Sequence, residues 1–248
     1  LRGMLAPLPF DVVVNCAALT AVDYCETHAD EAMQVNTHAV RGLGEVCAEK
    51  GVRCIHVSTD YVFDGEKWEP YTEEDVPKPI SVYGQSKRLG EIGLLESSES
   101  HLVVRVSWVF GPDRPSFIDQ VLQRAAEQDH VDAIADKWAV PTYTRDAAQL
   151  MLPLLFDHPG GGVLHLCNTG SCTWQEYGQY ALDCAASLGR KLKAKTVGPL
   201  KMAELSAFIA RRPPYTVMST ARLAATIGHQ PRPWQAAVED YVRTLSNK

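Results

Sequence analysis

The chain has 248 residues, of which 46% are hydrophobic, enough for one α/β unit with a substantial core and a small second lobe. Its formal net charge of −6 argues against a general binder of nucleic acid or anionic membranes, because such binding requires a basic face. The sequence shows no apolar run long enough to span a membrane, no secretion signal and no C-x-x-C motif, which predicts a cytoplasmic protein with reduced cysteines.

Hydrophobic patterning predicts strands that alternate with helices along the chain. We expect strands at residues 10–15, 52–58, 102–109, 131–134 and 163–167, and helices at residues 29–50, 82–95, 117–128, 144–156 and 173–188. The long helix over residues 29–50 is expected to direct one face to the core through Ala32, Val35, Ala39, Leu43 and Val46. Such alternation is typical of a parallel sheet with helices on both faces.

Three side chains around the second strand and the next helix point to carbonyl reduction. Tyr83 and Lys87 stand one helical turn apart, so the ammonium can lower the pKa of the phenol and make it a usable proton donor. Thr59 follows the buried strand, at the sheet edge where active sites of open parallel sheets lie, and could bind the same carbonyl oxygen. A bare Tyr-x-x-x-Lys is usually a solvated pair; here its place shortly after a strand-ending Ser-Thr favours the catalytic interpretation.

Several motifs, taken in chain order, resemble those of the dTDP-4-dehydrorhamnose reductases, which are extended short-chain dehydrogenases. The resemblance runs from about residue 11 to the C-terminus. The motifs that carry it are residues 15–18, 58–65, 82–87, 107–111, 141–142 and 212–213.

This resemblance implies a Rossmann-like, doubly wound parallel sheet and a smaller lobe. The dinucleotide-binding domain would comprise residues 1–110 and 140–170, and a C-terminal α/β substrate lobe would comprise residues 111–139 and 171–248. The first predicted strand corresponds to the family's fourth, and no Gly-rich phosphate-binding turn follows it. We therefore expect the family's first strands and their Gly-rich turn either to precede this sequence or to have been lost, and the chain alone to have little activity.

The resemblance also implies the reaction and its residues. An NADP- or NAD-dependent enzyme would reduce a nucleotide-linked 4-keto-6-deoxy sugar, with Tyr83 as proton donor, Lys87 on the nicotinamide ribose and Thr59 orienting the carbonyl. The choice between NADP and NAD stays open. The implied cofactor-binding residues are Asn15, Ala17, Ala18, Asn36, Ser58, Tyr61, Tyr83 and Lys87.

Four further residues are implied as substrate-binding: Trp108, Trp138, Arg211 and Arg212. Several of the predicted site residues also have a structural interpretation: Trp108 and Tyr61 could pack in the core, Asn36 could lie on a helix surface, and the arginines could cap a helix.

The chain also departs from the family, which leaves the identity of the sugar open. Lys137 stands where relatives commonly carry glutamine, and Ala139 where they carry glycine. Arg145 aligns with an acidic residue that binds a metal in some relatives, so we expect no metal and no metal-bridged dimer; another homodimer stays open. The second hypothesis is a non-catalytic binding protein, since the family includes the regulatory subunit of methionine adenosyltransferase. The Ser58-Thr59 and Ser107-Trp108 pairs favour the enzyme.

Overall fold

The computed structural model describes residues 2–5, 7–156, 160–205 and 207–246. Its strands are β1 (Val12–Asn15), β2 (Arg53–Thr59), β3 (Leu102–Val106), β4 (Val109–Phe110), β5 (Val131–Ile134), β6 (Trp138–Ala139), β7 (Thr142–Tyr143), β8 (Gly162–His165), β9 (Cys172–Thr173) and β10 (Val197–Leu200). Its α-helices are α1 (Arg2–Leu5), α2 (Val22–Thr27), α3 (Ala29–Met33), α4 (Ala39–Glu49), α5 (Val82–Ser97), α6 (Phe117–Glu127), α7 (Thr144–Phe156), α8 (Trp174–Ser187), α9 (Ala221–Ile227) and α10 (Trp234–Ser246). Shorter helical segments are the π-helix η1 (Gln34–His38) and the 3₁₀-helices η2 (Asp60–Val62) and η3 (Met202–Glu204).

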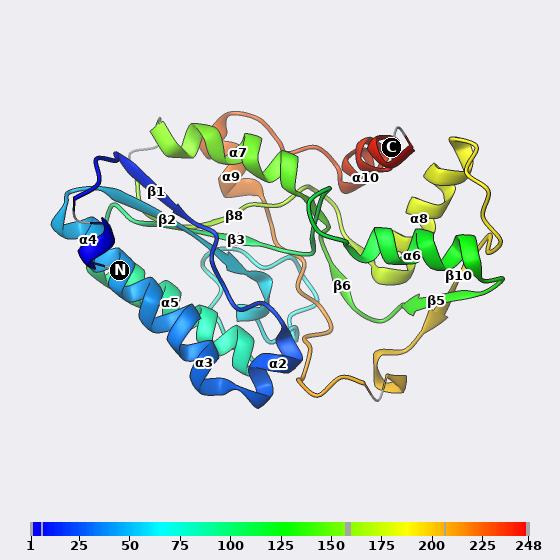
Figure 1. Ribbon diagram of the computed structural model, residues 1–248, viewed down its shortest axis with the longest axis horizontal. Coiled ribbons are helices and arrows are strands. Elements are labelled where there is room, and N and C mark those ends of the chain that lie inside the picture. The colour runs from blue at the N-terminus through cyan, green and yellow to red at the C-terminus, as the bar shows by residue number, and fades with distance from the viewer. Residues whose placement is uncertain (1, 6, 157–159, 206, 247–248) are drawn as a thin grey trace.

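The main sheet is parallel, in the order β1-β2-β3-β8, with helices on both faces (Figure 1). Alternation along β3 explains the two cores: Val103 packs with residues of α4 and α5, and its neighbour Val104 packs with residues of α7 and α9. Both valines are fully buried, as expected for a strand covered on both faces. The predicted doubly wound arrangement is confirmed.

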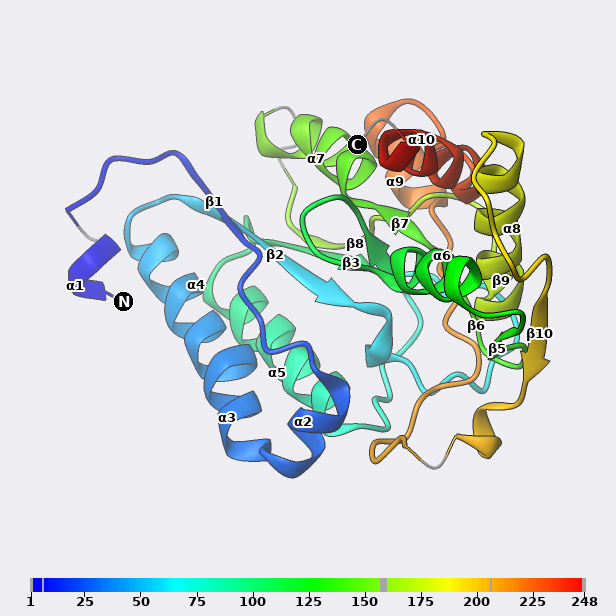
Figure 2. The same ribbon diagram turned by 45° about the vertical axis from the view of Figure 1, so that its right-hand side comes forward.

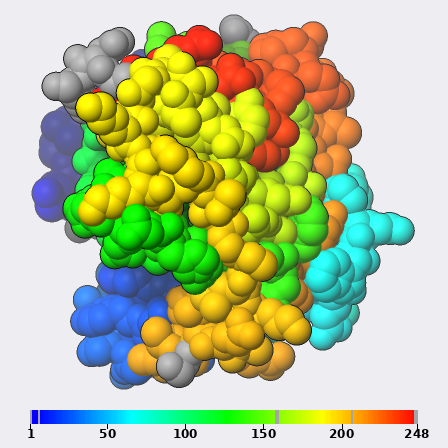
Figure 3. Space-filling model, turned by 90° about the vertical axis from the view of Figure 1, so that its right-hand side faces the viewer, coloured from blue at the N-terminus to red at the C-terminus, as the bar shows by residue number. Residues whose placement is uncertain are grey.

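The remaining elements form a second lobe beside the sheet, seen to the right in Figures 1 and 2. Helices α6, α8 and α10 pack around Tyr177 and Tyr241, and β5 pairs in parallel with β10. Figure 3 shows the outer face of this lobe, with the yellow segment that contains α8 next to the green α6. Leu223 of α9 packs with the core of the main sheet, although residues 171–248 were assigned to the substrate lobe. The exact lobe boundaries stay a prediction.

The long helix predicted over residues 29–50 contains a π-helical turn, η1, between α3 and α4. A π turn takes up an extra residue, so the face that meets the core shifts after it. Ala39, expected on the buried face, is therefore exposed, and Val40 is buried in its place. Asn36 is fully buried within η1.

The strand predicted over residues 102–109 ends at Val106. Trp108 has a φ of 39°, a left-handed conformation that an extended strand does not accommodate. The chain then resumes as β4, which leaves the main sheet and pairs with β7. Among the described residues, no helix is both long enough and apolar enough to cross a bilayer.

Candidate active site

Thr59 and Tyr83 are brought together by the end of β2 and the start of α5. The Ser81 hydroxyl caps α5 by accepting a hydrogen bond from the Gly84 amide (3.2 Å), which places Tyr83 in the first turn. A Cβ on Gly84 would lie 2.2 Å from the carbonyl oxygen of Tyr61, so only glycine lets this turn approach η2 so closely. The Ser81 cap and Gly84 thus help to place the hydroxyl groups of Thr59 and Tyr83 close together.

The Tyr83 phenol lies in a buried environment with Thr59 as its hydrogen-bond partner. Its ring meets Tyr61 edge-on, with ring centres 5.6 Å apart. Burial raises the pKa of Tyr83, the hydrogen bond with Thr59 lowers it, and the negative charge of Asp60 raises it again. The net rise keeps the phenol protonated at neutral pH, which is the form a proton donor needs.

Lys87 is buried one turn further along α5. Its Nζ lies 3.0 Å from His56 Nε2 and donates to the Val57 carbonyl oxygen (2.7 Å). Burial lowers the pKa of Lys87 to about 8, while the charge of Glu91 opposes this shift. Both of these contacts of Lys87 are thus on β2. The expected net lowering of the Tyr83 pKa is not found here, because burial dominates and raises it.

Asp60, which was not predicted from the sequence as a site residue, binds the hydroxyl groups of Thr59 and of two residues that are distant from it along the chain. Its buried carboxylate accepts hydrogen bonds from the hydroxyls of Thr59 (3.1 Å), Ser107 (3.0 Å) and Thr216 (2.5 Å). Burial raises the pKa of Asp60, and the nearby charge of Lys137 lowers it. The acidic residue directly after the strand-ending Thr59 was the available signal.

Lys137, the departure from the family pattern, is fully buried beside this group. Its Nζ donates to the Pro213 carbonyl oxygen (2.6 Å) and lies 5.0 Å from the centre of the Tyr61 ring. Burial lowers the pKa of Lys137 to about 8. The amine of Lys137 and the ring of Tyr83 thus both contact Tyr61.

The predicted cofactor residues near β1 gather at the carboxyl end of that strand. Asn36 is a clamp: its side chain accepts from the Leu19 amide (2.9 Å) and donates to the Leu19 carbonyl (2.9 Å) and to Ser86 Oγ (3.0 Å). The loop that contains Ala17 and Ala18 is thereby held against α5. Asn36 is therefore a buried residue, and the alternative interpretation of its side chain as a helix-surface amide is wrong.

The donor groups present fit the nicotinamide end of a dinucleotide. The Lys87 ammonium, the Tyr83 phenol and the Ala17–Ala18 loop lie at the carboxyl ends of neighbouring parallel strands, where such sheets bind ligands. The exposed Cys16 of this loop is close enough for its charge to influence the pKa of Lys87. The side chain of Ser58 is buried beside Glu91, and the predicted contact of Ser58 with the cofactor stays a prediction.

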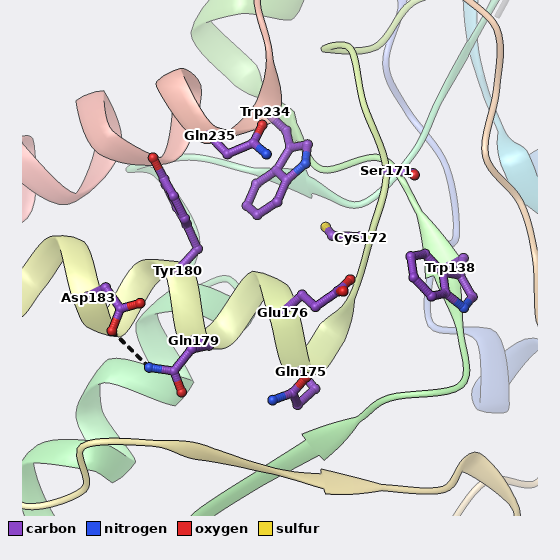
Figure 4. Close-up of a pocket in the computed structure, with 10 residues that line it drawn as sticks. All are labelled: Trp138, Ser171, Cys172, Gln175, Glu176, Gln179, Tyr180, Asp183, Trp234 and Gln235. Carbon is purple, nitrogen blue, oxygen red and sulfur yellow. Dashed lines mark hydrogen bonds between the residues drawn. The ribbon is translucent and has the colours of Figure 1, made fainter.

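The two predicted substrate tryptophans lie in different pockets. Trp138 of β6 lines a surface pocket of about 380 Å³ with Glu176 and Tyr180 of α8 and Trp234 of α10 (Figure 4). Trp108 lies in a smaller aromatic pocket of about 110 Å³, where its ring centre is 5.5 Å from that of Trp174. The structure therefore does not bring the two together in one pocket.

The neighbouring arginines also differ in their surroundings. Arg212 donates to both carboxylate oxygens of Asp23 (3.0 and 2.6 Å) and lies over the ring of Phe208 at 3.6 Å. The bonds from Arg212 lower the pKa of Asp23 to about 2. Arg211 is exposed. Of the two, Arg211 is the one whose guanidinium is open to an anionic ligand.

Comparisons with known proteins agree over almost the whole chain. The sequence model described as RmlD substrate binding domain matches residues 1–247. The dTDP-4-dehydrorhamnose reductase of Sinorhizobium fredii is 34% identical over 242 residues, which cover 95% of this chain and 80% of that protein. The spore coat polysaccharide biosynthesis protein SpsK of Bacillus subtilis is 33% identical over 237 residues, covering 96% of this chain and 80% of SpsK.

Solved structures show the same fold. The dTDP-4-dehydrorhamnose reductase of Bacillus anthracis, in complex with NADP, superposes with a TM-score of 0.90 at 28% identity, covering 98% of this chain and 84% of that one. The orthologue from Clostridium acetobutylicum gives a TM-score of 0.92 at 29% identity, covering 99% and 84%. The chain belongs to the RmlD substrate binding domain family, the family of the dTDP-4-dehydrorhamnose reductases.

Proposed function

We propose that the protein reduces the keto group of a nucleotide-linked 4-keto-6-deoxy sugar with NADPH. The observation that carries this proposal is the buried Thr59–Tyr83 pair beside Lys87 at the carboxyl end of β2. The relatives named as dTDP-4-dehydrorhamnose reductases support the sugar class, and the NADP complex of the Bacillus anthracis enzyme supports the cofactor. NAD stays the alternative cofactor.

In this reaction the bound nicotinamide cofactor would supply hydride to the keto carbon. Tyr83 donates its phenolic proton to the keto oxygen, and its raised pKa keeps that proton available. Thr59 would orient the same oxygen by turning its hydroxyl proton, which it donates to Asp60 in this structure, to the keto oxygen. Lys87 would hold the nicotinamide ribose, beside the loop with Ala17 and Ala18.

The decisive experiment measures NADPH oxidation by the full-length protein with a dTDP-linked 4-keto-6-deoxy sugar. We expect oxidation to require the sugar and the product to carry a hydroxyl at the former keto carbon. Cofactor and sugar binding without any turnover would overturn the proposal and favour the regulatory binding protein.

The two arginines supply a matched pair for the substrate diphosphate. Arg211→Ala is expected to raise KM for the nucleotide sugar by about tenfold or more with an unchanged Tm, because a charge-assisted hydrogen bond contributes roughly 1.5–3 kcal/mol. Arg212→Ala is expected to lower the Tm, because it leaves Asp23 without the partner that binds both its oxygens. Steady-state kinetics and thermal unfolding of both variants test this. An unchanged KM for Arg211→Ala would remove it from the substrate site.

The setting of the enzyme is also part of the proposal. A net charge of −6 and free thiols at Cys25, Cys47 and Cys54 support a cytoplasmic enzyme without a nucleic-acid partner. We further propose that residues 111–139, with most of residues 171–248, form the sugar-binding lobe. A homodimer stays open.

A further inference from the structure

His56 links the catalytic lysine to the loop that follows β1. Its fully buried imidazole has Asn15 Nδ2 at 3.0 Å from Nδ1 and Lys87 Nζ at 3.0 Å from Nε2. Asn15 in turn accepts a hydrogen bond from the Ala17 amide on its Oδ1 (3.1 Å). One chain of contacts thus runs from Lys87 to the loop that contains Ala17.

The imidazole of His56 is neutral, and a neutral imidazole has a single N–H. Burial and the charge of Lys87 lower the pKa of His56 to about 3. Because the Ala17 amide holds Asn15 Oδ1, Asn15 presents its NH₂ group to His56, so Nδ1 accepts and the proton sits on Nε2. That proton faces Lys87, which can accept it only as a neutral amine.

A charged Lys87 requires the opposite arrangement. An ammonium has donors alone, so His56 Nε2 must accept and Nδ1 must carry the proton. If Asn15 turns its side-chain oxygen to accept this Nδ1 proton, that oxygen leaves the Ala17 amide. In both arrangements Lys87 still donates to the Val57 carbonyl oxygen.

The charged groups around Lys87 and His56 set the balance between the two arrangements. Glu91, one turn beyond Lys87 on α5, raises the pKa of both Lys87 and His56 and is itself paired with Arg105 of β3. Cys16, in the loop after β1, also raises the pKa of Lys87. Burial outweighs both and lowers the pKa of Lys87 to about 8, so both charge states are accessible near neutral pH.

We propose that His56 is a positioning residue whose tautomer couples the charge of Lys87 to the Asn15–Ala17 contact of the loop after β1. When Lys87 is neutral, His56 has its proton on Nε2 and the Ala17 amide donates to Asn15 Oδ1. When Lys87 is charged, His56 has its proton on Nδ1 and the Ala17 amide loses this bond. This role rests on the proposed function, because it matters to catalysis only if Lys87 and this loop hold the cofactor.

Nitrogen-15 NMR of the histidine side chains of the full-length protein, without cofactor, tests the coupling directly. We expect His56 to pass from Nδ1–H to Nε2–H as the pH rises through about 8. His101 is the internal control: it is also fully buried, but its Nδ1 accepts from the Cys54 amide (3.2 Å) and its Nε2 donates to the Gly44 carbonyl (3.0 Å), so it keeps one tautomer. A single tautomer of His56 throughout the titration would overturn the inference.

Two variants give separate tests. Lys87→Met removes the titrating group, so His56 is expected to lose the switch and stay Nε2–H. Asn15→Asp presents an acceptor to Nδ1 and to the Ala17 amide at once, so His56 is expected to stay Nδ1–H. A switch that persists in both variants would contradict the coupling. A switch in the wild type without reductase turnover would instead contradict the proposed function, and turnover without a switch would contradict only the role of His56.

Discussion

Tyr83→Phe is expected to lower the kcat of the full-length protein by about 10²-fold or more, because it removes the proton donor while it keeps the ring. The ring packs edge-on against Tyr61, and phenylalanine preserves this contact. The hydroxyl of Tyr83 interacts with Thr59, which loses a partner but keeps its bond to Asp60. The fold and the affinity for NADPH should therefore change little.

Steady-state turnover and calorimetric titration with NADPH separate the two effects. The matched control is Tyr177→Phe, a buried tyrosine in the other lobe whose hydroxyl has no hydrogen-bond partner among the described residues. Tyr177→Phe is expected to leave kcat within a few-fold, because the hydroxyl that it removes has no hydrogen-bond partner and phenylalanine keeps the ring. Near-native turnover by Tyr83→Phe would remove the proposed acid.

The proposed catalytic residues Thr59, Tyr83 and Lys87 could be predicted from sequence because each lies in a recognisable local pattern. Thr59 ends a run of apolar residues, and Tyr83 and Lys87 share one face of a helix that Ser81 caps. These signals depend on neighbours within a few residues, and such periodic signals are the most reliable ones in a sequence. The parallel sheet follows from the same kind of pattern.

Residues missed from sequence depend on contacts that are distant along the chain. His56 reads only as an interruption of a buried strand until Lys87, 31 residues later, is seen 3.0 Å from it. The bond between Arg212 and Asp23 joins positions 189 residues apart, so no local pattern indicates that this arginine is already paired. Sequence reasoning could select both arginines but could not tell them apart.

Local patterns also failed where the backbone departs from regular geometry. The π turn at Asn36 and the left-handed Trp108 both lie among contacts with residues that are distant along the chain. Asn36 is held by Leu19 and Ser86, and Trp108 is packed against Trp174. Such departures are often found at functional sites, and both residues had been selected as site residues on other grounds.

Glu91→Ala is expected to destabilise the protein by about 3–5 kcal/mol, the usual cost of removing one partner of a buried ion pair. Its fully buried carboxylate accepts from Arg105 Nε (2.9 Å) and a terminal nitrogen of Arg105 (2.8 Å), and Arg105 is 1% exposed. The variant leaves a buried guanidinium without its counter-charge. Urea unfolding measures the loss, and Glu96→Ala on the same helix is the control, because Glu96 pairs with Arg41 in solvent.

The pH dependence of this loss identifies its origin. Burial raises the pKa of Glu91, but the bonds and charge of Arg105 outweigh it and bring the pKa below its usual range. A carboxyl with a lowered folded-state pKa stabilises the protein above its unfolded-state value of about 4.3, and this stabilisation fades as the pH falls through the folded-state value. The difference between wild type and Glu91→Ala should therefore shrink in acid. A difference that stays constant down to acid unfolding would mean that Glu91 stabilises α5 through packing and not through its charge.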